Sequence, residues 1–364
     1  MDKDREHTLR ALDLAANGVG LVSPNPLVGC VIVSPEGDIA GEGFYTFDRV
    51  THAEVIALAQ AGEKARGGTA YVSLEPHDHQ NKTRPCTEAL IEAGIKRVIC
   101  PIEDPNPLVR GRGFERLRNA GLEVVTGLLP DEASKLNEKF ICWHQKGRPF
   151  VHLKLAMSLD GRISLNRSVS TGLSGDEARL RVQEFRHGHD AILVGGNTAA
   201  ADDPMLTDRS GRPRRRPLTR VVLDNKLQIP ATANVVRTAN EFPTLVFTNS
   251  LEPKMETLRT SGVEVERTDE GARDLQRVLA HLQKREIQSV LVEGGSEVAG
   301  SFIDAGLVDK VTFLMSPLII GGHQAPVAIG GTGASSLDET FRLRDVSVTK
   351  HGDDVEITGY PQAQ

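Results

Sequence analysis

The order of strand-like and helix-like segments most constrains how this chain of 364 residues can fold. Short apolar runs typical of strands alternate with helix-like segments through the first half, and the alternation restarts after the sequence KGRP at 146–149. Such alternation predicts a partly parallel sheet with helices packed on its faces, once in each half. We therefore predict an α/β protein with two domains, 1–147 and 148–364.

Local patterns predict several elements in more detail. The turn sequence SPEGD at 34–38 lies between two apolar runs and predicts a hairpin. Residues 131–145 are expected to form one connecting helix, and a polar loop is expected after the strand at 190–196. A helix is expected directly after Gly294 and Gly295, which follow an apolar strand.

Composition excludes several classes of protein. A content of 39% hydrophobic and 4% aromatic residues fits a folded α/β chain and not a disordered one. The net charge of -6 argues against nucleic acid as a partner, and the basic stretch 209–216 is short enough to be a solvated loop or a phosphate contact. No apolar run is long enough to span a bilayer, and the charged start lacks a signal-peptide core, so we expect a cytoplasmic protein with no membrane partner.

One stretch between Thr51 and Cys86 indicates a metal site. His52 and Glu54 open a helix-like segment, a strand ends in Glu-Pro, and His77 and Cys86 follow. Two imidazoles and a thiolate suit zinc with water in the fourth position, while Glu54 would remain off the metal and transfer protons. The layout is typical of zinc-dependent base deaminases. The tripeptide His-Ala-Glu alone also occurs by chance, and the spacing from His77 to Cys86 is longer than Cys-x-x-Cys, so a chance match stays open.

Four segments of the first half together resemble the bifunctional riboflavin-biosynthesis deaminase/reductase family. They are SPNPLVGCV at 23–31, HAE at 52–54, EPHDHQNKTRPC at 75–86 and DPNP at 104–107. The resemblance extends over nearly the whole chain. It implies a cytidine-deaminase-like three-layer domain followed by a dihydrofolate-reductase-like domain, and it implies Zn²⁺ and NADPH as cofactors. The substrate contacts that it implies in the first domain are Asn25, His79, Lys82, Thr83, Asp104 and Asn106.

Three departures from the family lie close to the expected chemistry. His77 stands where the family has its first cysteine ligand, Asn81 where it has a glycine, and Tyr45 where it has a histidine. Imidazole is a good zinc ligand, and replacing a thiolate removes one negative charge from the site. We therefore predict that zinc and deaminase activity are retained, with a more electrophilic metal. The alternative is a decayed deaminase domain that serves as a scaffold.

The second half matches three short reductase motifs in the right order, KLAMSLDGR at 154–162, ADDPMLT at 201–207 and VEGG at 292–295. The resemblance implies that Lys154 and Glu293 lie at the reacting sugar carbon. Cofactor contacts are implied at Ala156, Gly172 (the family has tryptophan here), Thr198, Asp202, Asn225, Gly295, Ser296, Glu297, Val298, Ala299, Gly300 and Ser301. Substrate contacts are implied at Ser170, Arg186, Leu206, Arg209 and Glu293, with Arg186 and Arg209 as clamps for a terminal phosphate.

The resemblance implies two successive reactions on a small pyrimidine ribosylamine phosphate. The first is hydrolytic deamination of the pyrimidine, and the second is hydride transfer from NADPH that opens the ribose to a ribityl chain. Three alternatives remain from the residues alone: a reductase with an inactive deaminase-like domain, a nucleic-acid base deaminase fused to a nucleotide-binding domain, and a non-catalytic ligand-binding regulator. Homo-oligomer formation is left open.

Overall fold

The computed structural model describes residues 3–49, 51–78, 84–166, 171–251 and 253–362. The chain forms two compact units, each with its own sheet. Unit 1 comprises Met1–Arg148 together with Pro213–Arg215, and unit 2 comprises Pro149–Arg212 and Arg216–Gln364. No helix in the described part of the chain has the length and apolar character that crossing a membrane requires.

Unit 1 is built on a five-stranded mixed sheet. The strand β1 is antiparallel to both of its neighbours, whereas the remaining strands run parallel to one another. The predicted hairpin is present, since β1 and β2 pair across the SPEGD turn. In spatial order the strands are β2 (Ile39–Phe44), β1 (Gly29–Val33), β3 (Thr69–Val72), β4 (Arg97–Cys100) and β5 (Glu123–Thr126).

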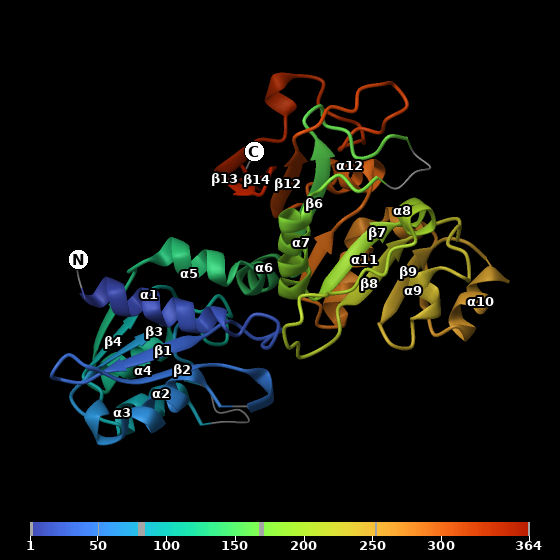
Figure 1. Cartoon of the computed structure of the whole chain (residues 1–364). Coiled ribbons are helices and arrows are strands. Elements are labelled where there is room, and N and C mark those ends of the chain that lie inside the picture. The colour runs from blue at the N-terminus through green and yellow to red at the C-terminus, as the bar shows by residue number, and fades with distance from the viewer. Residues whose placement is uncertain (1–2, 50, 79–83, 167–170, 252, 363–364) are drawn as a thin grey trace. The chain divides into compact units, whose positions relative to one another are not determined.

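Helices cover both faces of this sheet and give the three-layer arrangement that was predicted (Figure 1). On one face α1 (Lys3–Ala16) buries Ala11 and Leu14 against Val31 of β1. On the other face the apolar side chains of three helices pack against the opposite side of the strands. These helices are α2 (Ala53–Ala61, continued by the 3-10 turn Gly62–Ala65), α3 (Cys86–Glu92) and α4 (Arg112–Asn119).

The prediction of a single connecting helix over 131–145 is wrong, because two helices are present there. They are α5 (Pro130–Leu136) and α6 (Glu138–Lys146), and Asn137 separates them with φ -102° and ψ 21°. The Asn137 side chain accepts a hydrogen bond from the Leu27 N–H and donates one to the Leu27 carbonyl, each at 2.9 Å. An asparagine side chain that pairs with backbone in this way competes with helix continuation.

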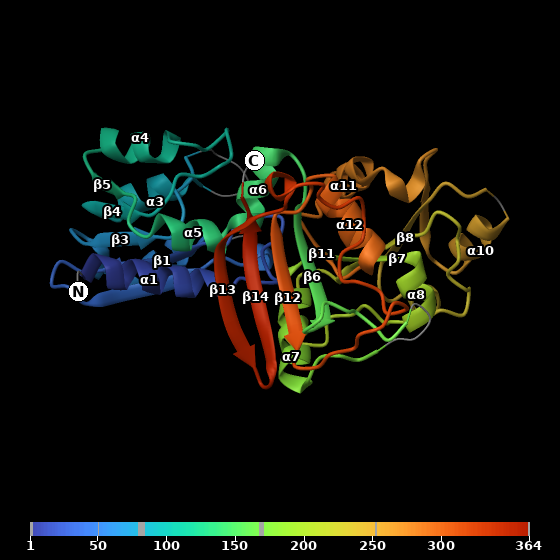
Figure 2. The same cartoon turned by 90° about the horizontal axis from the view of Figure 1, so that it is seen from above.

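Unit 2 is built on a nine-stranded sheet whose first seven strands in spatial order run parallel. The last two strands are antiparallel, and Figure 2 shows them beside β12. The spatial order is β10 (Glu264–Arg267), β9 (Thr244–Thr248), β8 (Thr219–Leu223), β7 (Ala191–Gly195), β11 (Ser289–Val292), β6 (Phe150–Ser158), β12 (Lys310–Ser316), β14 (Asp354–Pro361) and β13 (Leu343–His351).

Helices also cover both faces of the second sheet. One face is packed by α11 (Leu275–Lys284) and α12 (Ser296–Asp304), and the opposite face by α8 (Gly196–Asp202), α9 (Asn234–Arg237) and α10 (Lys254–Thr260). The prediction of a polar loop after the strand at 190–196 is partly wrong, because the first residues of that segment form α8. The helix α7 (Asp176–Gly188) buries Ala178 and Val182 against Leu314 of β12.

Candidate functional site

The predicted metal ligands of unit 1 meet at one point although they come from three different segments. His52 directly precedes α2, Cys86 is the first residue of α3, and His77 lies in the segment after β3. One ligand atom from each lies within 4.8 Å of the others, and the two imidazole rings are 4.5 Å apart between centroids. In a tetrahedral zinc site such atoms lie roughly 3.3–3.8 Å apart, so a small contraction would suffice, and the donor set is one that zinc prefers.

Two glycines of β2 bring the metal-site helix onto the sheet. A Cβ atom at Gly41 would lie 2.0 Å from the Ala57 carbonyl oxygen, and one at Gly43 would lie 2.5 Å from the Ala53 carbonyl oxygen. No side chain fits at either position, so α2 packs directly on the strand. This close approach fixes the start of α2, where His52 and Glu54 lie.

Glu54 is buried beside the three ligands but is not part of them. Its side chain is 2% exposed, and its Oε2 atom has no hydrogen-bond partner among the described residues. Burial and the adjacent Glu54 carboxylate together raise the pKa of the Cys86 thiol well above its usual range. A thiolate at this position therefore requires a cation next to it, which fits the proposed zinc.

Glu75, which the sequence showed only as part of a Glu-Pro motif, organises the loop after β4. Its carboxylate accepts the backbone N–H groups of Asp104, Gly111 and Gly113, each at 3.0 Å, and that of Phe114 at 3.4 Å. Hydrogen bonds from several amides to one buried carboxylate hold a loop firmly. Glu75 thus positions the predicted substrate contacts Asp104 and Asn106, although it was not itself predicted to belong to the site.

Asp104 is nearly buried, and its carboxylate accepts the Asn106 N–H at 2.7 Å. Burial raises the pKa of Asp104 to about 6; the Asn106 N–H opposes this rise and the charge of Glu75 adds to it. The side chain therefore changes its charge close to neutral pH, in the loop where a substrate contact is predicted. Asn106 is half-buried, and its own Oδ1 accepts the Leu108 N–H at 3.1 Å.

Asp104→Asn is expected to stabilise the protein at pH 7.5 and not below pH 4. A raised pKa means that the folded state binds the proton more tightly, so the contribution of Asp104 to stability is largest below its ordinary value of 3.8 and declines as pH rises to about 6. The neutral amide avoids that loss, a gain of at most roughly 3 kcal/mol. Urea unfolding of both proteins at the two pH values measures it; an equal difference at both would contradict the prediction.

The segment that carries Asn25 is fixed by side chains that come from elsewhere in unit 1. Asn25 Nδ2 donates to Tyr45 Oη at 2.7 Å, and the ring of Tyr45 lies 5.4 Å from that of His52. Asn137 holds the neighbouring Leu27 through its two hydrogen bonds. Burial raises the pKa of Tyr45, with the Asn25 hydrogen bond acting in the opposite direction. Three further predicted contacts, His79, Lys82 and Thr83, lie outside the described residues.

In unit 2 the two predicted catalytic residues lie side by side. Lys154 is in the middle of β6, Glu293 follows β11, and Lys154 Nζ is 3.7 Å from Glu293 Oε2. Burial lowers the pKa of Lys154, with the Glu293 charge opposing this. Burial would raise the pKa of Glu293, but the charges of Arg186 and Lys154 outweigh it and hold that pKa at about 2. Glu293 is therefore ionised at neutral pH, and both side chains are largely shielded from solvent, with 9% of Lys154 and 11% of Glu293 exposed.

Arg186, predicted as a substrate contact and phosphate clamp, binds Glu293 and the backbone in this structure. Its Nε and Nη2 donate to the two oxygens of Glu293 at 2.9 and 3.1 Å, and its Nη1 donates to the Thr207 carbonyl at 3.1 Å. Bidentate pairing of this kind fixes both side chains. Arg186 is thus placed to orient Glu293.

The helix α7 also holds the loop that carries Leu206 and Arg209. The Arg209 N–H donates to Gln183 Oε1 at 2.8 Å, and His187 Nδ1 lies 3.0 Å from Asp208 Oδ2. Leu206 is buried with a positive φ of 51°. Sequence reasoning missed Gln183, His187 and Asp208, although Gln183 lies on the same face of α7 as Arg186, which follows it by three residues.

The predicted cofactor contacts gather where strands of the second sheet end. Gly295 precedes α12, and a Cβ atom there would lie 3.3 Å from Thr198 Oγ1 of α8. Ala156 is half-buried in β6, whereas Asn225, after β8, uses its Oδ1 to accept the Ala272 N–H at 2.7 Å. Carboxyl ends of parallel strands are the usual place for ligands in such sheets.

The run from Ser296 to Ser301 lies in α12, so its members face different surroundings. Ser296 and Glu297, at the start of α12, are accessible, and Val298 packs against Gly294 and against Gly195 at the end of β7. Ala299 is fully buried in the core, and a Cβ atom at Gly300 would lie 2.3 Å from the backbone of Gly330. The amino end of α12 is therefore the part of the run that is open to a dinucleotide. Of the remaining predicted contacts, Asp202 and Gly172 are exposed, and Ser170 lies outside the described residues.

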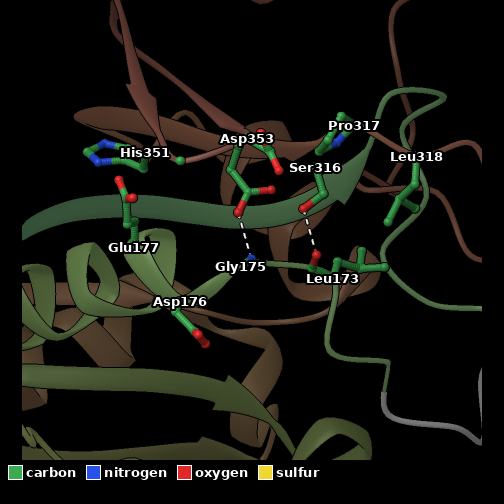
Figure 3. Close-up of a pocket in the computed structure, with 11 residues that line it drawn as sticks. Leu173, Gly175, Asp176, Glu177, Ser316, Pro317, Leu318, His351 and Asp353 are labelled. Atoms are coloured by element: carbon green, nitrogen blue, oxygen red, sulfur yellow. Dashed lines mark hydrogen bonds between the residues drawn. The ribbon is translucent and has the colours of Figure 1, made fainter.

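A separate pocket of about 340 Å³ opens in unit 2 between the amino end of α7, the end of β12 and the β13–β14 turn (Figure 3). The Gly175 N–H donates to Asp354 at 2.7 Å, and Ser316 Oγ donates to the Leu173 carbonyl at 2.8 Å. Among the described residues, none of those predicted for either reaction lines this pocket.

Comparison with known proteins matches both halves. Residues 1–102 match the cytidine and deoxycytidylate deaminase zinc-binding region, and residues 149–357 match the RibD C-terminal domain. The riboflavin biosynthesis protein RibD of Bacillus amyloliquefaciens is 42% identical over 354 residues, covering 97% of this chain and 95% of its own length. The RibD of Aquifex aeolicus is 40% identical, covering 97% of each chain.

Solved structures match over the same extent. Acinetobacter baumannii RibD, form 1, superposes with a TM-score of 0.88 at 34% identity, covering 99% of both chains. The Thermotoga maritima protein described as a diaminohydroxyphosphoribosylaminopyrimidine deaminase/5-amino-6-(5-phosphoribosylamino)uracil reductase superposes with a TM-score of 0.86 at 36% identity, again over 99% of both chains.

Proposed function

This chain belongs to the RibD family, the bifunctional deaminase/reductases of riboflavin biosynthesis, and on that premise we propose how its own residues divide the two reactions. We assign deamination to residues 1–147 and reduction to residues 148–364. The observation that carries the assignment is the presence of two separate, partly buried groups of side chains: His52, His77 and Cys86 beside Glu54, and Lys154 beside Glu293.

The deaminase substrate that we propose is 2,5-diamino-6-(5-phosphoribosylamino)pyrimidin-4(3H)-one, a pyrimidine ribosylamine phosphate. His52, His77 and Cys86 would hold zinc, which supplies an activated water to the amine-bearing ring carbon. Glu54 accepts the proton of that water and delivers it to the departing amine, so that ammonia leaves and a carbonyl remains. The buried, unpaired Oε2 of Glu54 supports this role over that of an inactive scaffold domain.

The second reaction opens the ribose of the deaminated product to a ribityl chain. NADPH, when bound, would supply the hydride for C1 of the sugar. Lys154, whose pKa is lowered by burial, would donate a proton to the ring oxygen as its bond to C1 breaks. Glu293, oriented by Arg186, keeps Lys154 charged and in place. A cytoplasmic location and a small-molecule partner complete the proposal.

The experiment that tests the deaminase half is a series at His77. Zinc content and ammonia release are measured on the same preparations of wild type, His77→Cys and His77→Ala. We expect zinc and ammonia release to persist in wild type and His77→Cys and to fall together in His77→Ala, because one of three protein ligands is lost.

NADPH oxidation with the deaminated substrate serves as the internal control and should be the same in all three proteins. Equal zinc and equal ammonia release in His77→Ala would remove His77 from the ligand set. A wild type that oxidises NADPH but neither binds zinc nor releases ammonia would instead show a reductase with an inactive first domain.

A further inference from the structure

We propose that Tyr45 and Asn25 together recognise the lactam edge of a pyrimidinone, that is, its adjacent ring N–H and C=O groups. The inference rests on the proposed deaminase function, because it names the part of the substrate that one wall of that site reads. It makes Tyr45 a specificity residue of this chain.

The hydrogen bond between the two side chains determines what they offer a ligand. Asn25 Nδ2 donates to Tyr45 Oη at 2.7 Å. The phenolic proton of Tyr45 then remains available as a donor, and Asn25 Oδ1 remains available as an acceptor. If the direction of the bond were reversed, the pair would again present one donor and one acceptor. In either direction of the Asn25–Tyr45 hydrogen bond, the two side chains together complement a ligand that has one acceptor and one donor side by side.

The pair lies beside the metal ligands and is held there firmly. Tyr45 is 7% exposed, and its ring lies 5.4 Å from the His52 ring. Asn137 clamps Leu27, two residues after Asn25, through both amide atoms. On the other side, Arg215 donates to the Ser23 carbonyl and stacks on the ring of Phe47 at 3.3 Å. Side chains anchored in this way recognise a ligand without losing further conformational freedom.

In the proposed substrate, the lactam lies directly beside the ring carbon that loses its amine. In a 2-amino-pyrimidin-4(3H)-one the carbon that loses its amine is bonded to the ring N–H, and the carbonyl follows directly. A ring held with its amine-bearing carbon at the three metal ligands presents this N–H and C=O to the adjacent wall, where Tyr45 and Asn25 lie. A ring that lacks the lactam would leave two buried polar groups unpaired, which is a strong basis for rejection.

The test compares Tyr45→Phe with Tyr71→Phe. Tyr71 is a second buried tyrosine of unit 1, and its hydroxyl donates to Asp4 at 2.7 Å, so this variant loses a buried hydrogen bond in a different place. We expect Tyr45→Phe to raise the KM for ammonia release by roughly 5- to 15-fold while kcat changes less than about threefold, since one binding hydrogen bond is lost. Tyr71→Phe should leave KM unchanged, and zinc content should be the same in all proteins.

A direct binding measurement separates this inference from the proposed function. Isocytosine carries the lactam and 2-aminopyrimidine does not, and ligand-observed NMR titration compares their affinities without turnover. Wild type and Tyr71→Phe should prefer isocytosine by roughly tenfold, and Tyr45→Phe should lose that preference. An active wild type with an unchanged KM and preference in Tyr45→Phe would overturn the inference alone. A wild type without ammonia release that still shows the Tyr45-dependent preference would overturn the deaminase function and leave the lactam site.

Discussion

Glu54→Gln is expected to lower ammonia release by roughly 10²- to 10⁴-fold while zinc content stays unchanged. The glutamine keeps the size of the side chain and its place in α2, but it can neither accept a proton from the attacking water nor deliver one to the amine. Zinc is unaffected because Glu54 lies beside the three ligands and does not belong to them. The loss therefore isolates proton transfer from metal binding.

The matched control is Glu63→Gln, which makes the same chemical change at a fully exposed carboxylate of the same unit. Initial rates of ammonia release, zinc by atomic emission and NADPH oxidation are measured on each protein. We expect Glu63→Gln to match the wild type in all three, and Glu54→Gln to differ in ammonia release alone. A Glu54→Gln protein that loses its zinc would show that Glu54 is a ligand, and one that keeps full ammonia release would remove it from the mechanism.

The structural features that could be predicted from the sequence are those determined by residues close together in the chain. The hairpin around SPEGD and the helix after Gly295 follow from turn residues and apolar spacing, and both are present. The three metal ligands were predicted from short motifs in neighbouring segments, and the structure brings them together. The predicted alternation of strands and helices gave the α/β class of both halves correctly.

The parts that were missed depend on contacts between residues far apart in the chain. Asn137 breaks a helix because it binds Leu27, 110 residues away, and no helical pattern shows that. The pairing of Arg186 with Glu293 was not predicted, because the two residues are 107 positions apart. Glu75 holds its loop through backbone N–H groups, which carry no side-chain signal at all. Side-chain pairing of this kind is decided by tertiary structure and leaves little trace in a single sequence.

Glu293→Gln is expected both to stop most NADPH oxidation and to destabilise unit 2. The change removes the carboxylate that faces both Arg186 and Lys154, and removal of one member of a buried ionic group costs roughly 3–5 kcal/mol. Reduction suffers because Lys154 then loses its charge more readily and is no longer held in place. The deficit in stability should shrink as pH rises, because burial already lowers the pKa of Lys154 and the neutral amine needs no partner.

A double-mutant cycle separates the cost of unpaired charge from the value of the pair. Arg186→Met alone leaves Glu293 with Lys154, and the double variant Glu293→Gln/Arg186→Met removes the bidentate pair together. We expect the double variant to be less destabilised than the sum of the single variants by roughly 1–3 kcal/mol, because neither Arg186 nor Glu293 is left without the other, although Lys154 still lacks its carboxylate. Urea unfolding at pH 7 and pH 9 gives the free energies of unfolding.

For Arg186, Glu293 and Lys154, the rate of NADPH oxidation and the free energy of unfolding are expected to respond differently to the double substitution. NADPH oxidation should stay low in the double variant even though its stability recovers, since Lys154 still lacks the carboxylate that orients it. The control is Glu264→Gln, which removes one partner of the exposed Arg285–Glu264 pair in the same unit and should cost no more than about 1 kcal/mol with normal NADPH oxidation. Strict additivity in the cycle, or normal turnover by Glu293→Gln, would show that Arg186 and Glu293 do not act as the unit that orients Lys154.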